Sequence, residues 1–183
     1  MAQLIVVAGP PCSGKSTLAG ALGLAVAAPV LDIDEIRKIV IPNSKQTQED
    51  RNIAYRCMHL VAEKLLKAGV SRVVLAATYG RRQPRQWLSS IAERTGTQVC
   101  AIACKVSPEM AVARFRSRQP GHAAVDLTED LVRRQAADYD YAAARVVDST
   151  IRVEASVAQA EGYVRSGETT ELADWVSHGT VSV

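Results

Sequence analysis

The segment that most constrains the fold is GPPCSGKS at residues 9–16, which matches the pattern G-x-x-x-x-G-K-[S/T]. It follows an apolar run at 4–8 and precedes a helical pattern at 15–25, so it predicts a turn from a strand into a helix. Backbone N–H groups of such a turn converge on phosphate oxygens, and its glycines permit the close approach. An accidental glycine-rich turn is the alternative, but the complete motif in this context favours a phosphate-binding loop (P-loop).

The residues of this loop have distinct expected roles. Lys15 is expected to reach the β- and γ-phosphates of a nucleoside triphosphate, and the hydroxyl of Ser16 to ligate magnesium. We therefore predict ATP and Mg²⁺ as the bound groups. The residues expected to hold the nucleotide are Gly9, Pro11, Cys12, Ser13, Gly14, Lys15, Ser16 and Thr17.

Short β-branched runs alternate with amphipathic stretches along the chain, which indicates βαβ units around a parallel sheet. Strands are expected at 4–8, 30–32, 72–76, 99–106 and 145–147. Helices are expected at 15–25, 35–40, 49–67, 84–94, 108–117, 128–141 and 154–165. The predicted fold class is α/β: a three-layer α/β/α P-loop NTPase fold, with a five-stranded, mostly parallel sheet of the nucleoside-monophosphate-kinase type and a small lid.

The length of 183 residues, 48% of them hydrophobic, favours a single domain, which we expect to span 1–165. The segment 118–127 contains Pro120 and Gly121 between two helical patterns and is expected to be a mobile lid over the triphosphate. Residues 166–183 are polar and weakly periodic, and we expect a tail that is disordered or packs against a partner.

The overall charge and the cysteines exclude several classes. A net charge of +3 is too balanced for a typical nucleic-acid-binding domain, so a nucleic-acid partner is not expected. The 4 cysteines form no CxxC pair, which argues against a zinc site or a redox dithiol. Neither a secretory leader nor a long apolar run is visible. We expect a cytoplasmic protein without membrane contact, either a monomer or a homodimer.

The sequence downstream of the P-loop indicates which class of nucleotide-hydrolysing or nucleotide-transferring protein this chain can be. The DxxG and NKxD motifs of GTPases are absent from the sequence. The strand at 72–76 runs into Ala77 and Thr78, whereas a motor or strand-exchange ATPase should have an acidic pair there. The missing acid argues against a water-activating ATPase.

Acidic residues instead follow the second strand, at Asp32 and Asp34. Ligands bind at the carboxyl edge of a parallel sheet, so both carboxylates are expected to face the triphosphate. Asp32 could hold a metal-bound water, and Asp34 could accept the proton of an acceptor hydroxyl. The alternative is structural, because Asp32 followed by Glu35 is also a helix N-capping arrangement.

With these motifs, the chain resembles the small P-loop kinases. This family includes polynucleotide 5′-kinase domains, chloramphenicol phosphotransferase-like and zeta-toxin-like enzymes, and more distantly gluconate and shikimate kinases. The resemblance spans about 4–164, and its most specific elements are GPPCSGKST, Asp34-x-x-Arg37, Ala77-Thr78 followed by Arg85, Arg114-x-x-x-Arg118 and Arg134-Gln135. It implies that Asp34 is the general base, that Arg37 contacts the acceptor, and that Arg114 and Arg118 are lid arginines. Ala77 departs from the family, because polynucleotide-kinase-like members tend to carry an aspartate there; any metal must then rely on Ser16 and Asp32.

Further candidates for the acceptor site come from two segments. Tyr79, Arg81 and Arg85 follow the third strand at the same sheet edge, and could bind an anionic substrate or form a solvated turn. Tyr55 comes from the long helix that such kinases place over the acceptor, although a core tyrosine is equally compatible. Arg114 and Arg118 share one helix face, which could point at the triphosphate or at solvent.

The sequence thus predicts transfer of the γ-phosphoryl group of ATP to a hydroxyl of a small molecule. The expected catalytic residues are Lys15, Asp34, Arg114 and Arg118. The expected substrate-binding residues are Arg37, Tyr55, Tyr79, Arg81 and Arg85. The alternatives are a nucleic-acid 5′-hydroxyl kinase and a nucleotide-binding regulatory protein.

Overall fold

The computed structural model of the chain describes residues 2–117 and 127–180. Of the expected lid at 118–127, only Leu127 is among them. The predictions for Arg118 and for lid closure therefore lie outside the described residues.

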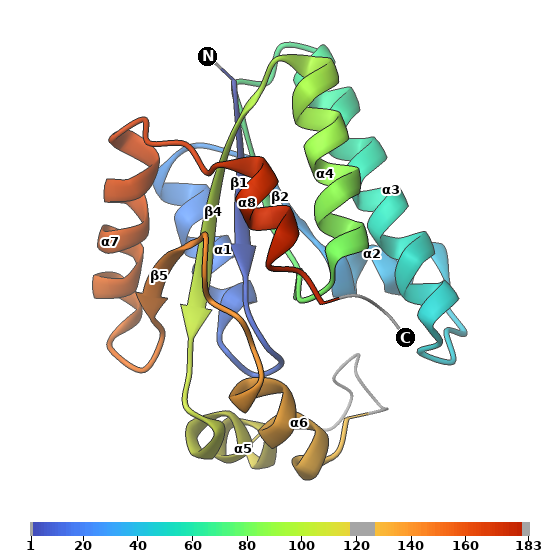
Figure 1. The fold of residues 1–183 in the computed structure, drawn as a ribbon, viewed down its shortest axis with the longest axis vertical. Coiled ribbons are helices and arrows are strands. Elements are labelled where there is room, and N and C mark those ends of the chain that lie inside the picture. Colours follow the sequence, from blue (N-terminus) through green and yellow to red (C-terminus); the bar gives the residue numbers. More distant parts are fainter. Residues whose placement is uncertain (1, 118–126, 181–183) are drawn as a thin grey trace.

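The centre of the fold is a five-stranded sheet in the order β2-β3-β1-β4-β5. The strands are β1 (Gln3–Ala8), β2 (Val30–Asp32), β3 (Arg72–Ala76), β4 (Gln98–Lys105) and β5 (Arg145–Asp148). Every described pairing is parallel, where the sequence predicted a mostly parallel sheet. All carboxyl ends consequently meet at one edge, the lower edge in Figure 1.

Helices cover both faces of the sheet, which explains why its central strands are apolar throughout. Ile5 and Val7 of β1 pack on one face with the buried residues of α1 (Lys15–Ala25) and α7 (Val153–Arg165). Leu4 and Val6 pack on the other face, toward α3 (Gln48–Lys67) and α4 (Arg82–Thr95). This arrangement is the predicted three-layer α/β/α fold.

Three further helices lie near the carboxyl edge of the sheet (Figure 1). They are α2 (Ile33–Val40), α5 (Pro108–Arg116) and α6 (Glu129–Ala137). Val112 of α5 and Val132 of α6 share a small apolar cluster with Cys12 of the P-loop. The pair α5 and α6 therefore rests on the phosphate-binding loop itself.

Several helix boundaries differ from expectation, and two of these differences coincide with hydrogen bonds near the strand ends. Helix α2 begins at Ile33 rather than at 35, because the Asp32 carboxylate caps it by accepting a 2.8 Å hydrogen bond from the backbone N–H of Asp34. Helix α6 ends at Ala137 rather than at 141, and Tyr139 beyond it donates a 2.6 Å hydrogen bond to the backbone carbonyl of Thr78. Both differences lie at the sheet edge.

The C-terminal segment folds back onto the domain, so the expectation of a disordered or partner-bound tail is wrong for residues 166–180. Helix α8 (Leu172–Ser177) places the Trp175 side chain, 1% exposed, in the same apolar cluster as α3 and α4. Thr180 then pairs with the loop before α4, donating to the carbonyl of Gly80 and accepting from the N–H of Arg82, each at 2.9 Å. The C-terminal segment therefore reaches the edge where the strands end.

In the part of the chain that the structure describes, no helix has the length and apolar character needed to cross a membrane.

Candidate active site

The P-loop connects β1 to α1 and has the backbone conformation that phosphate binding requires. Gly14 caps α1 with φ of +87°, which glycine adopts without strain. A Cβ on Gly9 would lie 2.6 Å from Ser13 Oγ, so only glycine fits there. The buried hydroxyl of Ser13 has no hydrogen-bond partner among the described residues. A bare helix N-terminus, close-approach glycines and an unpartnered donor together fit an anionic phosphate.

Two cationic side chains flank this loop. Lys15 Nζ lies 3.5 Å from the carbonyl oxygen of Pro10, a long contact that a phosphate oxygen can replace. Arg114 donates from Nη1 to the Cys12 carbonyl and to Ser149 Oγ, both at 3.3 Å, and from Nη2 to the Ser149 carbonyl. Arg114 is therefore held beside the phosphate loop and does not form an exposed helix face, and its catalytic role stays a prediction.

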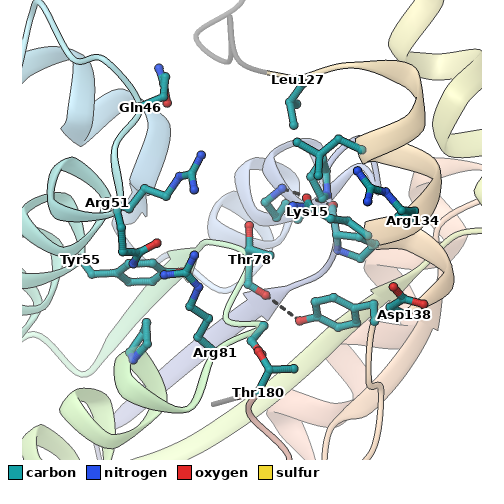
Figure 2. A pocket seen from close by; sticks show the side chains of 18 of the residues that line it. Lys15, Gln46, Arg51, Tyr55, Thr78, Arg81, Leu127, Arg134, Asp138 and Thr180 are labelled. Carbon is teal, nitrogen blue, oxygen red and sulfur yellow. Dashed lines mark hydrogen bonds between the residues drawn. The ribbon is translucent and has the colours of Figure 1, made fainter. Parts of the chain in front are cut away.

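Two cavities open at the carboxyl edge of the sheet. The smaller, of about 350 Å³, is bordered by the P-loop, Arg114 and the segment that follows β5. The larger, of about 480 Å³, lies between the P-loop, α2, α3, α6 and the loop after β3 (Figure 2). Lys15 and Asp34 line both cavities. These two residues thus stand where the two cavities adjoin.

Asp34 is held at this junction by a salt bridge. Arg37 Nη2 donates to Asp34 Oδ1 at 2.8 Å, and the Arg37 side chain is only 8% exposed while that of Asp34 is 29% exposed. Arg37 lines the larger cavity, as expected, and it also orients the carboxylate predicted to be the base. One oxygen of Asp34 faces an arginine, and the group remains reachable from the cavities.

The site fits magnesium only as a partner of the nucleotide. Ser16 lines the smaller cavity and offers a hydroxyl ligand, while one carboxylate oxygen of Asp32 accepts the hydrogen bond that caps α2. The residue after β3 is the buried Ala77, and no cluster of three or more His, Cys, Asp or Glu side chains occurs in the described part of the chain. Mg²⁺ commonly binds through one or two protein oxygens, phosphates and waters, which matches this sparse set.

The structure corrects two predictions for the acceptor site, because the Tyr79 and Arg85 side chains lie beneath the larger cavity and do not line it. Tyr79 is fully buried and its hydroxyl lies 2.8 Å from His59 Nε2. Arg85, 2% exposed, donates to the backbone carbonyls of Tyr79 and Trp175 and stacks on the Trp175 ring. Both are structural residues, and the docking of α8 is what withdraws Arg85 from the surface.

Tyr55 and Arg81 do line the cavity, as predicted. The hydroxyl of Tyr55 accepts a 2.9 Å hydrogen bond from the backbone N–H of Tyr79, and burial raises the pKa of Tyr55 to about 12, so the phenol stays neutral. Arg81 begins α4, and its side chain reaches toward the centre of the cavity (Figure 2).

Sequence reasoning missed several lining residues. In the smaller cavity they include Ser149, Ile151, Val153 and Ser156, which follow β5. In the larger cavity they include Gln46, Gln48, Asp138 and Thr180. The rule that strand ends carry ligands could have found the residues after β5, whereas Thr180 had no signal because its position depends on the docking of α8.

Comparison with known proteins places this geometry in a family. A family model described as an AAA domain matches residues 4–142. Comparison with curated proteins gives no match. Among solved structures, a sugar kinase from Janibacter sp. HTCC2649 is 19% identical with a TM-score of 0.68, over 99% of this chain and 100% of that one.

Two further structures show the same fold. A gluconokinase from Sinorhizobium meliloti is 20% identical with a TM-score of 0.66, covering 90% of this chain and 92% of that one. The Mycobacterium tuberculosis APS kinase CysC is 15% identical with a TM-score of 0.70, covering 90% and 98%. The chain thus belongs to this AAA domain family of P-loop proteins, and its fold is the one that small P-loop kinases share.

Proposed function

We propose that this protein is an ATP-dependent phosphotransferase that moves the γ-phosphoryl group of ATP to a hydroxyl group of a small molecule. The observation that carries the proposal is the position of Lys15 and Asp34, which line both cavities. A nucleotide-binding regulator needs the smaller cavity alone. A transferase needs a cation and a base where a donor space meets an acceptor space.

The residues present divide the chemistry between them. The P-loop and Ser16 would hold ATP and Mg²⁺, which supply the transferable phosphoryl group and neutralise part of its charge. Lys15 and Arg114 place positive charge beside the P-loop, where charge develops during transfer. Asp34 accepts the proton of the acceptor hydroxyl as its oxygen attacks phosphorus, and Arg37 keeps the carboxylate in place.

The names of the similar structures agree with this assignment, since they include a sugar kinase, a gluconokinase and an APS kinase in complex with AMPPNP and APS. Each of these descriptions concerns the named protein. What they support for this chain is the reaction class, and the acceptor is a separate question.

The test compares Asp34→Asn with Glu35→Gln. Glu35 is the next residue on α2 and pairs with exposed Lys38, so its variant is a matched control. ATP-dependent phosphorylation of a panel of small hydroxy compounds is followed by ADP release and by mass spectrometry of the product. We expect Asp34→Asn to reduce transfer by about 10²- to 10⁴-fold while ATP affinity, measured by calorimetry, stays near the parent value. Glu35→Gln should leave both unchanged.

Parental transfer by Asp34→Asn would reduce Asp34 to a helix-terminal residue and refute the proposed base. ATP binding without transfer to any small hydroxy compound would favour the regulator. Efficient labelling of a 5′-hydroxyl oligonucleotide would favour the nucleic-acid kinase.

A further inference from the structure

The larger cavity carries more positive charge than its own carboxylates balance. Besides Lys15, its lining includes Arg37, Arg51, Arg81 and Arg134, against the carboxylates of Asp34, Asp138 and Asp140. Arg37 is paired with Asp34, and Asp140, another lining residue, faces His178 at 2.8 Å. Among the described residues, neither Arg81 nor Arg134 has a carboxylate partner. The surplus charge therefore gathers on the part of the cavity away from the Asp34 salt bridge.

Arg51 and Arg81 bring two of these cationic side chains to the same wall of the cavity. They come from α3 and from the start of α4, and Figure 2 shows both side chains on the same side of the cavity as Tyr55. Burial, and after it the charge of Arg51, lower the pKa of Arg81 below its usual value. Two like charges held in partly buried positions repel each other, and an anion placed between them would remove that repulsion.

Arg134 completes the arrangement from the opposite wall. It projects from α6 across the cavity from Arg51 and Arg81 (Figure 2). Its neighbour Arg133 points elsewhere and pairs with Glu109 at 3.4 Å. Guanidinium groups on two walls suit an oxyanion, because each can donate paired N–H bonds to it.

We infer that the acceptor is a small organic oxyanion, whose charged group binds to Arg51, Arg81 and Arg134 while its hydroxyl lies at Asp34. This inference rests on the proposed phosphotransferase and specifies its substrate class. Carboxylate, phosphate and sulfate groups share the chemistry that these arginines recognise.

A small anion fits better than a nucleic acid. The surplus arginines gather in one cavity of about 480 Å³, which has the size of a small-molecule site. The whole chain has a net charge of only +3, whereas binding a strand takes a row of cations along its backbone.

The test uses matched pairs of small hydroxy compounds that differ only at the end distant from the hydroxyl. Carboxylates are tested with the pairs glycerate and glycerol, and gluconate and sorbitol. Phosphates are tested with glycerol phosphate and glycerol, and sulfates with sulfate esters and their parent alcohols. AMPPNP and Mg²⁺ are added first, so that the P-loop is not available to the probes. Saturable binding is measured by calorimetry and by chemical-shift changes, and transfer is measured separately with ATP.

We expect at least one charged compound to bind at least about 10-fold more tightly than its neutral partner. Arg81→Gln should weaken that binding by about 10- to 100-fold and leave the neutral partner unaffected. Arg133→Gln, one position from Arg134 on α6, is the control and should change neither. In the unliganded protein, Arg81→Gln should keep or raise the melting temperature, because it removes a repulsion; a structural arginine would lower it.

The outcomes separate this inference from the proposed function. Four results would each overturn the inference. The first two are equal binding of charged and neutral partners, and no saturable binding of any charged compound. The other two are an equal loss of binding in Arg81→Gln and Arg133→Gln, and preferential binding of a 5′-hydroxyl oligonucleotide. Charged compounds that bind through Arg81 but are never phosphorylated would support the anion site and refute the phosphotransferase. Transfer confined to neutral alcohols would support the phosphotransferase and refute the anion site.

Discussion

Acid should destabilise this protein through one buried histidine. His59 is 2% exposed and has its Nε2 2.8 Å from the hydroxyl of Tyr79. Its Nδ1 is buried without a hydrogen-bond partner in the described residues, so a second ring proton would have no acceptor. Burial accordingly lowers the pKa of His59 from 6.5 to about 4.

The sign and size of the effect follow from linkage. The unfolded chain takes up a proton at His59 below its ordinary pKa, and the folded chain does so only near its lowered pKa. The free energy of unfolding therefore falls as the pH falls through this interval. At about 1.4 kcal/mol per pKa unit, the loss between pH 7 and pH 5 amounts to about 2 kcal/mol, and it approaches about 3 kcal/mol near pH 4.

Denaturant unfolding at pH 7 and at pH 5 measures this loss, with His59→Gln as the variant. Glutamine keeps a hydrogen-bonding group for Tyr79 and does not titrate, so the variant should lose about 2 kcal/mol less than the parent between the two pH values. His178→Gln, at a position whose ring is partly exposed, controls for histidine removal as such. An identical pH dependence in parent and His59→Gln would refute the reasoning.

Two further substitutions probe the nucleotide site and the C-terminal helix. Lys15→Ala should reduce phosphoryl transfer by at least about 10²-fold. It should have little effect on stability, because the only described hydrogen bond of the Lys15 side chain is the long one to the Pro10 carbonyl. Full turnover would contradict the P-loop assignment, and Lys38→Ala, at an exposed lysine, is the control. Trp175→Ala should lower the free energy of unfolding by about 3–5 kcal/mol in denaturant titrations and raise the acceptor KM, because α8 carries Thr180 to the cavity. An effect no larger than that of Trp87→Ala, at a partly buried ring, would show that α8 docks without Trp175.

The predictions from the sequence were accurate where the determining signal is local. The P-loop, the five strands and most helices follow from motif and periodicity over a few residues, and all five strands lie within one residue of their expected bounds. The position of Asp34 near the P-loop was predictable because strand ends in a parallel sheet share an edge. These signals do not depend on distant parts of the chain.

Arg85 and Tyr79 show where such reasoning ends. Both follow β3 at the expected edge, yet Arg85 is turned inward by a partner 90 residues further along, the carbonyl of Trp175. Nothing in the local sequence distinguishes Arg85 from Arg81, which faces the cavity. Only tertiary packing decides which arginine of the loop binds a ligand and which supports the fold.

The docking of α8 also sets the order in which the protein can be completed during synthesis. The P-loop and its strands are made early, but the Tyr79 ring lacks its contact with the Trp175 ring, 5.6 Å away between centroids, until Trp175 has been added. At about 5–20 residues per second, the ribosome takes roughly 5–20 s to make the 90 residues from Arg85 to Trp175. The nascent chain can thus assemble a phosphate-binding loop well before Thr180 joins the lining of the larger cavity, and in that interval the apolar surface that Trp175 later covers is the one that a chaperone would meet.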